Sequence, residues 1–447
     1  MNLLTNGRVI TRDEGGKGYY EKGAVAYEGT KIVEVGEEAA LRAKYPQAEI
    51  IDAKGGVIMP AFINAHTHIY SALARGLSIV GNNPTNFYEV LDGTWWAMDR
   101  KLTLEGSRAS ADALYIDCIK QGVTTIFDHH AAYCEIPGSL FQIGESAKKF
   151  GIRSCLCYEV SDRDGEEKCL QAIKENADFI TYCQKQNDPM LAAMFGGHAL
   201  FTISDKTFDR MVEANNGRTG YHIHVSEGMN DVYDSLQNYG RRPVQRLQDH
   251  GILGEKTILG HCIHVNTAEM DIIRETNTMV VNNPESNMGN AIGICPVLQL
   301  YKRGILLGMG TDAYTNDMLE SLKVALCSQR SQNCLPNVGW CEVTDMLFKN
   351  NAKIGARYFP DQLGVLKAGA AADIIVMDYK PFTPFSDENI DGHMIFGMTG
   401  RQCQTTIAAG KVLMKDRVLV NIDEEAENAH ILEAAKKLWG DLNHRVY

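Results

Sequence analysis

Histidine and carboxylate side chains recur in small groups that follow short apolar segments of this chain. His66 and His68 flank a single threonine. In an extended backbone this spacing turns both imidazoles to the same side, where they can hold one metal ion. Two histidines at a turn are an equally good interpretation of this one pair. The pair therefore needs partners elsewhere in the sequence before it indicates chemistry.

Partners of the right kind follow other apolar segments. They are His198, His224, Glu227, His261 and Asp312. Nine of the thirteen histidines lie in or just after predicted strands, at positions 66, 68, 129, 130, 198, 222, 224, 261 and 264. Three neutral imidazoles and one carboxylate suit a first-row divalent metal ion and leave room for water. Chance placement does not assemble such a set at the ends of strands, so the sequence predicts a metal site.

The elements that must position these groups form an alternating pattern. Eight short apolar segments predict strands at 57–59, 124–127, 153–157, 194–197, 221–225, 257–260, 278–281 and 305–309. Amphipathic stretches between them predict helices at 105–121, 139–150, 205–214 and 267–275. Eight β/α units in series are typical of an α/β fold with a (β/α)8 barrel of the TIM type. Catalytic groups in such a barrel lie just beyond the carboxyl ends of the strands, where these side chains occur.

Both ends of the chain are rich in short strands. Turn signals such as Asn6-Gly7 and Glu28-Gly29 punctuate an N-terminal meander, and a strand and a hairpin are expected at 372–378 and 405–413. We expect one composite β-sandwich built from both ends. The predicted domains are residues 1–56 for its N-terminal part, 57–362 for the barrel, and 363–447 for its C-terminal part. A charged amphipathic helix is expected at 423–438, on the outside.

Five motifs of this chain carry a resemblance to a known family. They are Pro60-Ala61-Phe62-Ile63-Asn64-Ala65-His66-Thr67-His68, His224-Val225-Ser226-Glu227, Gly260-His261-Cys262, Asn283-Pro284-Glu285-Ser286-Asn287 and Gly310-Thr311-Asp312. Together they resemble the amidohydrolase superfamily. Within it they are similar to the mononuclear deaminase branch, which includes guanine, cytosine, triazine and adenosine-type aminohydrolases. The resemblance covers nearly the whole chain and implies a metal-bearing (β/α)8 barrel with a composite β-sandwich.

The resemblance also implies a role for each matching position. The implied ligands of one divalent metal ion are His66, His68, His224 and Asp312. Zinc is expected first, with iron, nickel and manganese as alternatives. Glu227 matches the general acid/base, His261 and Asp312 match groups that take a proton from water, and His198 matches a substrate contact. Binuclear relatives carry a bridging lysine after the fourth strand, and residues 190–205 contain none. The resemblance therefore implies a single ion.

Three further positions are expected at the substrate. Asp128 and His129 follow the second predicted strand, beside His130, and they serve either specificity and water ordering or a satisfied buried cluster. Trp95 and Trp96 belong to a long insertion at 77–103 that is expected to cover the mouth. One indole can stack on a heteroaromatic ring. Because neighbouring residues of a helix face different ways, at most one of the two is expected there, and we name Trp95.

The chain departs from its relatives at two places. Tyr158 follows the third predicted strand and is expected to contact substrate, but adenosine-type relatives have a substrate-binding arginine nearby that this chain lacks. Many relatives also have a histidine before the Asn-Pro of the seventh motif, where this chain has Asn282. Asparagine cannot act as a titrating base. Both departures weaken any inference about the individual substrate. Arg153, inside the third strand, is expected to be structural.

The chemistry that this set implies is hydrolytic deamination of a small amino-substituted heterocycle, purine- or pterin-like. A divalent ion lowers the pKa of bound water from ~15.7 toward ~7, and the resulting hydroxide attacks the ring carbon that bears the amino group. Glu227 protonates the neighbouring ring nitrogen and helps ammonia leave. The alternative is hydrolysis of a ring amide, or of another leaving group, at the same metal site. A non-catalytic scaffold is the third interpretation.

Composition limits the partners of the protein. The net charge is −12, which repels a phosphate backbone, so nucleic acid is not expected. No stretch approaches ~18 apolar residues, and the first residues do not resemble a signal peptide, so neither membrane association nor export is expected. Twelve scattered cysteines without a C-x-x-C motif indicate a reducing, cytoplasmic setting. We expect a small-molecule substrate and a homodimer or higher homo-oligomer.

Overall fold

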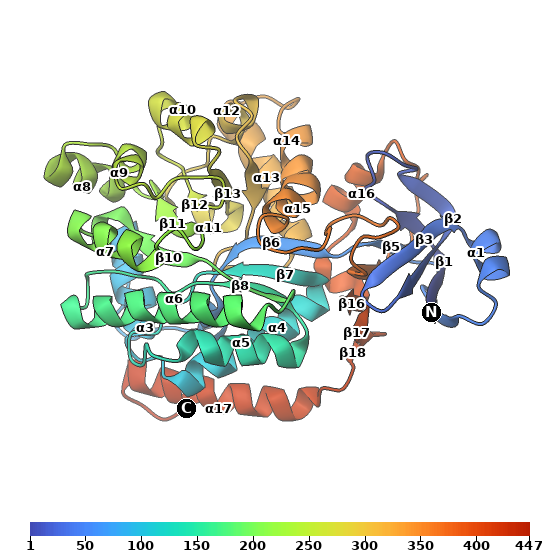
Figure 1. Ribbon diagram of the computed structural model, residues 1–447, viewed down its shortest axis with the longest axis horizontal. Coiled ribbons are helices and arrows are strands. Elements are labelled where there is room, and N and C mark those ends of the chain that lie inside the picture. Colours follow the sequence, from blue (N-terminus) through green and yellow to red (C-terminus); the bar gives the residue numbers. More distant parts are fainter.

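Both ends of the chain meet in one nine-stranded sheet beside a barrel in the computed structural model, which describes residues 1–447 (Figure 1). The strand order is β18-β17-β16-β15-β5-β1-β2-β3, with β4 paired to β1. The strands of this terminal sheet are β1 (Asn2–Ile10), β2 (Tyr19–Glu28), β3 (Lys31–Glu37), β4 (Glu49–Asp52), β5 (Val57–Pro60), β15 (Ile374–Met377), β16 (Cys403–Ala408), β17 (Lys411–Lys415) and β18 (Val418–Leu419). The expected joining of the two ends is confirmed.

The middle of the chain forms the barrel, in which every strand pair is parallel. Its strands are β6 (Phe62–Thr67), β7 (Val123–Asp128), β8 (Arg153–Leu156), β9 (Leu191–Ala193), β10 (Phe195–Ala199), β11 (Tyr221–Val225), β12 (Ile258–His261), β13 (Met279–Asn282) and β14 (Leu307–Met309). β9 and β10 share the fourth position and are interrupted at Met194. A bridge between Thr67 and Asp312 joins the first and last positions, so the ring closes beside predicted metal ligands.

The first barrel strand differs from the prediction. The segment Val57–Met59 does form a strand, β5, but it pairs with β1 and β15 in the terminal sheet. The barrel begins with β6, which already contains His66. Both segments are short, apolar and buried, so periodicity cannot tell them apart. Only the pairing of the strands separates them. The domain bounds 1–56, 57–362 and 363–447 stay a prediction.

The helices surround the barrel, except the first, which packs against β1, β2 and β3 of the terminal sheet. They are α1 (Glu38–Lys44), α2 (Phe87–Val90), α3 (Trp96–Asp99), α4 (Leu104–Gln121), α5 (Ser139–Phe150), α6 (Glu166–Gln186), α7 (Asp205–Asn215), α8 (Met229–Tyr239), α9 (Pro243–Asp249), α10 (Thr267–Glu275), α11 (Pro284–Gly289), α12 (Val297–Lys302), α13 (Met318–Asn333), α14 (Trp340–Asp345), α15 (Asn351–Gly355), α16 (Ile390–Gly397) and α17 (Glu424–Asn443). The expected terminal helix, α17, runs along the outside beside α4 (Figure 1). None of the helices combines the length and hydropathy that a membrane span requires.

A buried ion pair connects the barrel to the terminal sheet at the end opposite the mouth. Arg153, at the start of β8, is fully buried and pairs with Asp373, just before β15. Asp373 also accepts hydrogen bonds from the Thr124 hydroxyl at 3.0 Å and the Ala409 amide at 2.7 Å. Removing one partner of such a pair leaves an uncompensated buried charge, which costs about 3–5 kcal/mol. The structural role expected for Arg153 agrees with this position.

The insertion after β6 lies over the mouth of the barrel. A 3₁₀-helix at Ile69–Ala74 follows the strand, and residues 77–103, here called the lid segment, contain α2, a π-helical turn at Leu91–Trp95 and α3. The side chain of Asn86 begins α2 by accepting a hydrogen bond from the Glu89 amide at 3.1 Å. This cap fixes where the helical part of the lid segment starts.

Candidate active site

Three histidines from two strands converge at the mouth of the barrel. His66 and His68 come from β6 and the residue after it, and His224 comes from β11. One ring nitrogen from each lies within 4.8 Å of the other two, and all three rings are buried. The second nitrogen of each ring is engaged: His66 Nδ1 with His222 Nε2 at 2.8 Å, His68 Nδ1 with the His129 carbonyl at 2.6 Å, and His224 Nδ1 with the His198 carbonyl at 2.9 Å.

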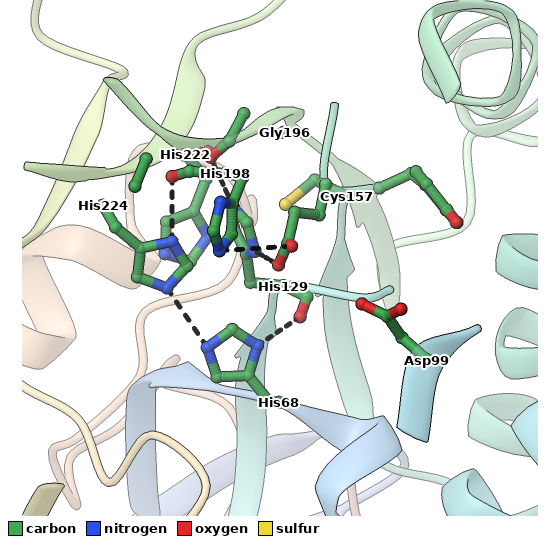
Figure 2. A network of polar contacts seen from close by, with 12 residues as sticks. His68, Asp99, His129, Cys157, Gly196, His198, His222 and His224 are labelled. Carbon is green, nitrogen blue, oxygen red and sulfur yellow. Dashed lines mark hydrogen bonds and ion pairs between the residues drawn. The ribbon is translucent and has the colours of Figure 1, made fainter. Parts of the chain in front are cut away.

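These contacts determine which nitrogens are free to bind a metal ion (Figure 2). A carbonyl only accepts, so His68 and His224 donate through Nδ1 and keep a lone pair at Nε2. The two Nε2 atoms nevertheless face each other at 3.2 Å, and His66 Nε2 is buried without a partner. Burial holds the pKa of His66 and His224 well below the usual range, in the neutral form that ligates metals. Converging buried lone pairs fit a divalent cation.

Asp312 adds a carboxylate to the three imidazoles. Its Oδ1 lies 3.3 Å from His68 Nε2, and its Oδ2 lies 3.4 Å from His261 Nε2. The Ser286 hydroxyl donates to Oδ2 at 2.7 Å and holds the carboxylate in place. Asp312 and His261 both have left-handed backbone conformations, with φ of 54° and 68°. Non-glycine residues adopt this conformation rarely, and here it occurs at the two strand ends that carry site residues.

A pair of amides orients His261. Its Nδ1 contacts Asn287 Oδ1 at 2.7 Å, and the Asn287 amide nitrogen donates to Asn282 Oδ1 at 3.0 Å. With Asn287 presenting its oxygen, His261 donates through Nδ1 and keeps Nε2 as an acceptor facing Asp312. His261 Nε2 is buried and has no hydrogen-bond partner. Asn282, which the sequence could not place, thus acts on the site through Asn287.

Glu227 faces the same point from the end of β11. Its Oε1 lies 3.5 Å from His261 Nε2. Burial, and then the negative charge of Asp312, raises the pKa of Glu227 well above its ordinary value. A buried carboxyl with a raised pKa holds its proton more firmly and can donate it, which is what a general acid requires.

A small cavity adjoins these groups. Its volume is about 30 Å³, close to the space that one water molecule occupies. The residues of the cavity wall are His68, Tyr70, Phe87, Leu91, Trp95, Trp96, Glu159, His198, His224, Glu227, Asn290, Asp312 and Ala313. Phe87, Leu91 and both tryptophans belong to the lid segment, so the expected covering of the mouth is confirmed. A second hollow of about 380 Å³ shares Trp95, Asp312 and Ala313 with the wall.

The positions of the two tryptophans differ from the prediction that at most one of them reaches the cavity. Trp95 packs edge-on against Tyr70 with ring centroids 6.1 Å apart, and Trp96 packs against His198 at 5.7 Å. Both belong to the cavity wall. Neighbouring residues of a helix point about 100° apart rather than in opposite directions, so two large side chains can border one cavity.

Two of the five predicted substrate contacts, His198 and Trp95, border the cavity, and three do not. Asp128, His129 and Tyr158 are fully buried outside the cavity wall. Asp128 accepts a hydrogen bond from the Ile69 amide at 2.6 Å, the His129 carbonyl faces His68, and the Tyr158 hydroxyl accepts from the Ala132 amide at 3.0 Å. They hold the loops that carry the site, because backbone groups of those loops need buried partners.

The sequence analysis missed one charged residue of the cavity wall, Glu159. It follows Tyr158 after β8, and its carboxylate lies near His129, His198 and Arg163. Arg163 in turn pairs with Asp99 at the end of the lid segment. Its place after a barrel strand, like that of the predicted ligands, is a signal that could have found it.

Comparisons with known proteins agree with this geometry. Residues 57–413 match the Amidohydrolase family, and residues 23–48 match a bacterial imidazolonepropionase-like composite domain. The chain is 30% identical to a 5′-deoxyadenosine deaminase of Methanosarcina mazei over 99% of both chains. It superposes on a zinc-bound adenosine deaminase of Xanthomonas campestris with a TM-score of 0.84, 22% identity and 98% coverage of both chains. It superposes on the atrazine chlorohydrolase of Arthrobacter aurescens with a TM-score of 0.80 and 24% identity, covering 97% of this chain and 100% of the other.

The family match covers most of the chain, and the relative from Methanosarcina matches it from end to end. The predicted resemblance is confirmed, and with it the prediction of a hydrolase acting on carbon–nitrogen bonds. The chain belongs to the amidohydrolase family.

Proposed function

We propose that this protein hydrolytically deaminates a small amino-substituted heterocycle, purine- or pterin-like, with one divalent metal ion, zinc first. The observation that carries the proposal is the facing of His68 and His224 Nε2 at 3.2 Å beside Asp312 and the buried carboxyl of Glu227. His66, His68, His224 and Asp312 are the proposed ligands. A divalent ion held there supplies Lewis acidity, which lowers the pKa of water to near neutrality.

The protein groups divide the proton transfers between them. His261 Nε2 and Asp312 face the site as acceptors and take a proton from the attacking water. Glu227 gives its proton to the ring nitrogen next to the amino-bearing carbon, which makes that carbon electrophilic. The proton that His261 and Asp312 took from the water is then delivered to the amino group, which leaves as ammonia. His198 and Trp95 border the space in which the ring must lie.

Metal analysis together with an ammonia assay tests the proposal. The purified protein is assayed with guanine, pterin, cytosine, a triazine and 5′-deoxyadenosine. We expect about one metal ion per chain and ammonia from at least one ring. One ion without ammonia, but with hydrolysis of a ring amide or of another leaving group, would show the alternative hydrolase. Absence of metal binding would contradict the ligand assignment.

Glu227→Gln tests the proton donor without changing the shape of the site. Glutamine cannot supply the proton, so we expect metal content to stay and turnover to fall by ~10²–10⁴-fold. A metal-loaded, fully active Glu227→Gln protein would refute the role of Glu227. We also propose a homo-oligomer of this barrel, which light scattering of the purified protein tests.

A further inference from the structure

Glu159 is a buried carboxylate in the cavity wall that the reaction scheme above does not use. Its side chain is only 2% exposed. Oε2 lies 3.4 Å from His129 Nδ1, Oε1 lies 3.5 Å from His198 Nε2, and Arg163 Nη2 is 3.8 Å from Oε1. All three distances are longer than a good hydrogen bond. The carboxylate is therefore stabilised by nearby charge, but no side chain donates a close hydrogen bond to it.

The two neighbouring rings cannot supply those donors while they are neutral. His129 Nε2 faces the carbonyls of Gly197 and His222 at 2.9 and 3.1 Å, so its hydrogen is there. The Thr202 hydroxyl donates to the Ala199 carbonyl at 2.8 Å, so it accepts from His198 Nδ1 at 2.9 Å. The nitrogens that face Glu159 are then the ones without hydrogen. The carboxylate oxygens of Glu159 therefore keep lone pairs that can accept a hydrogen bond on the cavity side.

The rest of the cavity wall adds negative charge and no cation. Of its residues Glu159, Glu227 and Asp312 are acidic, and none is lysine or arginine. Arg163 stays behind Glu159, paired with Asp99 and packed over the rings of Trp96 and Tyr133 at 5.1 and 4.1 Å. No cationic side chain of the wall could pair with an anionic group such as a phosphate. The wall fits a neutral or cationic ring with hydrogen-bond donors.

Glu159 is close enough to the proposed metal ligands to touch the reacting ring itself. One Glu159 oxygen, one His129 nitrogen and one His68 nitrogen all lie within 4.8 Å of one another. A heterocycle seated against these ligands would bring its own N–H groups within reach of Glu159.

We propose that Glu159 accepts a hydrogen bond from a ring N–H next to the amino-bearing carbon, and that it selects 2-amino-4-oxo rings, as in guanine and pterins, over the adenine ring of a nucleoside. This inference rests on the proposed deaminase function. In a 2-amino-4-oxo ring, one flanking nitrogen carries hydrogen for Glu159, and the other has a lone pair that Glu227 can protonate. In adenosine the ring nitrogen next to the amino-bearing carbon is an acceptor, so it repels the carboxylate and offers no ring N–H to it.

The ratio of catalytic efficiencies between the two ring classes tests the inference. Zinc-loaded wild type and Glu159→Gln are assayed for ammonia release from guanine, pterin and 5′-deoxyadenosine. We expect wild type to prefer the 2-amino-4-oxo rings by ~100-fold or more in kcat/KM. Glu159→Gln should narrow this preference at least ~10-fold with unchanged zinc content. Glu285→Gln, a buried carboxyl outside the cavity wall, is the matched control and should leave the preference intact.

If Glu159 had a purely structural role, Glu159→Gln would lower kcat/KM equally for all substrates. An equal loss of kcat/KM on both ring classes therefore overturns the inference. A wild type that prefers 5′-deoxyadenosine also overturns it. If no ring releases ammonia, the proposed function fails, and Glu159 is judged by binding instead. Quenching of tryptophan fluorescence by guanine, pterin and 5′-deoxyadenosine then measures affinity for the zinc-loaded protein. The inference is supported if wild type binds the 2-amino-4-oxo rings more tightly than 5′-deoxyadenosine and Glu159→Gln loses this difference. Equal affinity of wild type for both ring classes overturns it.

Discussion

Two groups of side chains beside the cavity, a metal half and a substrate half, contain the same residue types but use them differently. On the metal half, the imidazoles of His66, His68 and His224 turn free lone pairs toward one point. On the substrate half, His129 and His198 turn theirs toward Glu159, whose charge Arg163 already opposes. In both halves the hydrogen-bond partner of the second ring nitrogen decides where the lone pair points. Residue type alone therefore does not distinguish a metal ligand from a ring that supports a carboxylate.

The largest expected effect comes from removing a ligand on the metal half. His68→Ala or His224→Ala should lose the metal ion and lower ammonia release by roughly 10³-fold or more, since the Lewis acid is lost. Metal analysis and steady-state assays measure both effects. His264→Ala is the matched control, because this half-buried histidine binds the Ile292 carbonyl at 2.8 Å, away from the converging lone pairs. Retention of metal and activity in His68→Ala would remove the distinction between the halves.

The second prediction concerns Glu285, a buried carboxyl without a cationic partner. This carboxyl adjoins Ser286, accepts from the Ser321 hydroxyl at 2.9 Å and has no cationic partner. Burial raises its pKa from 4.5 to about 7. The folded state therefore keeps a proton that the unfolded chain releases above pH 4.5. The free energy of unfolding falls as pH rises from 4.5 through 7, by up to about 3 kcal/mol, and the loss is complete above pH 7.

Glu285→Gln should remove this dependence. Denaturant unfolding at pH 5 and pH 8 measures the free energy of unfolding of both proteins. We expect the free energy of unfolding of the variant, relative to that of the wild type, to be higher at pH 8 than at pH 5. An equal difference between the two proteins at both pH values would show that burial of this carboxyl has no energetic cost.

A smaller effect is expected from the amides that orient His261. Asn282→Ala removes the acceptor for the Asn287 amide, so Asn287 can turn its nitrogen toward His261. We expect kcat to fall ~10–100-fold with metal retained, and the pH profile of kcat to shift because His261 loses its fixed tautomer. Asn333→Ala, at the exposed end of α13, is the control. An unchanged pH profile would assign Asn282 a packing role only.

The smallest expected effect concerns the lid segment. The cavity of about 30 Å³ is smaller than ligand pockets, which measure ~300–1,000 Å³, so we expect the lid segment to move during turnover. Residues 81–86 are largely exposed, and we expect proteolysis to begin there. Saturating product should slow this cleavage several-fold by holding Trp95 and Trp96 closed. Cleavage that starts elsewhere, or that product does not slow, would show that substrate enters by another route.

How well the sequence predicts each feature depends on how local its cause is. His66 and His68 share one strand end, and His224 with Glu227 share another, so spacing and alternation mark them as candidates, and the family resemblance implied their roles. The assignment of Val57–Met59 to the barrel was wrong because its pairing partners, β1 and β15, lie far away in the sequence. Trp96 and Glu159 were missed as parts of the wall because packing of the lid segment and the loop after β8 places them there.

The sequence by itself determined the barrel, the terminal sheet and the set of metal-type ligands. It could do so because the alternation of strands and helices, and the position of a residue after a strand, are properties of neighbouring residues. Only the tertiary structure decided that β5 leaves the barrel, that both tryptophans border the cavity, and that Asp128, His129 and Tyr158 are buried outside its wall. It also decided the direction of each imidazole lone pair. These features depend on hydrogen bonds and packing between segments far apart in the chain, which no local pattern contains.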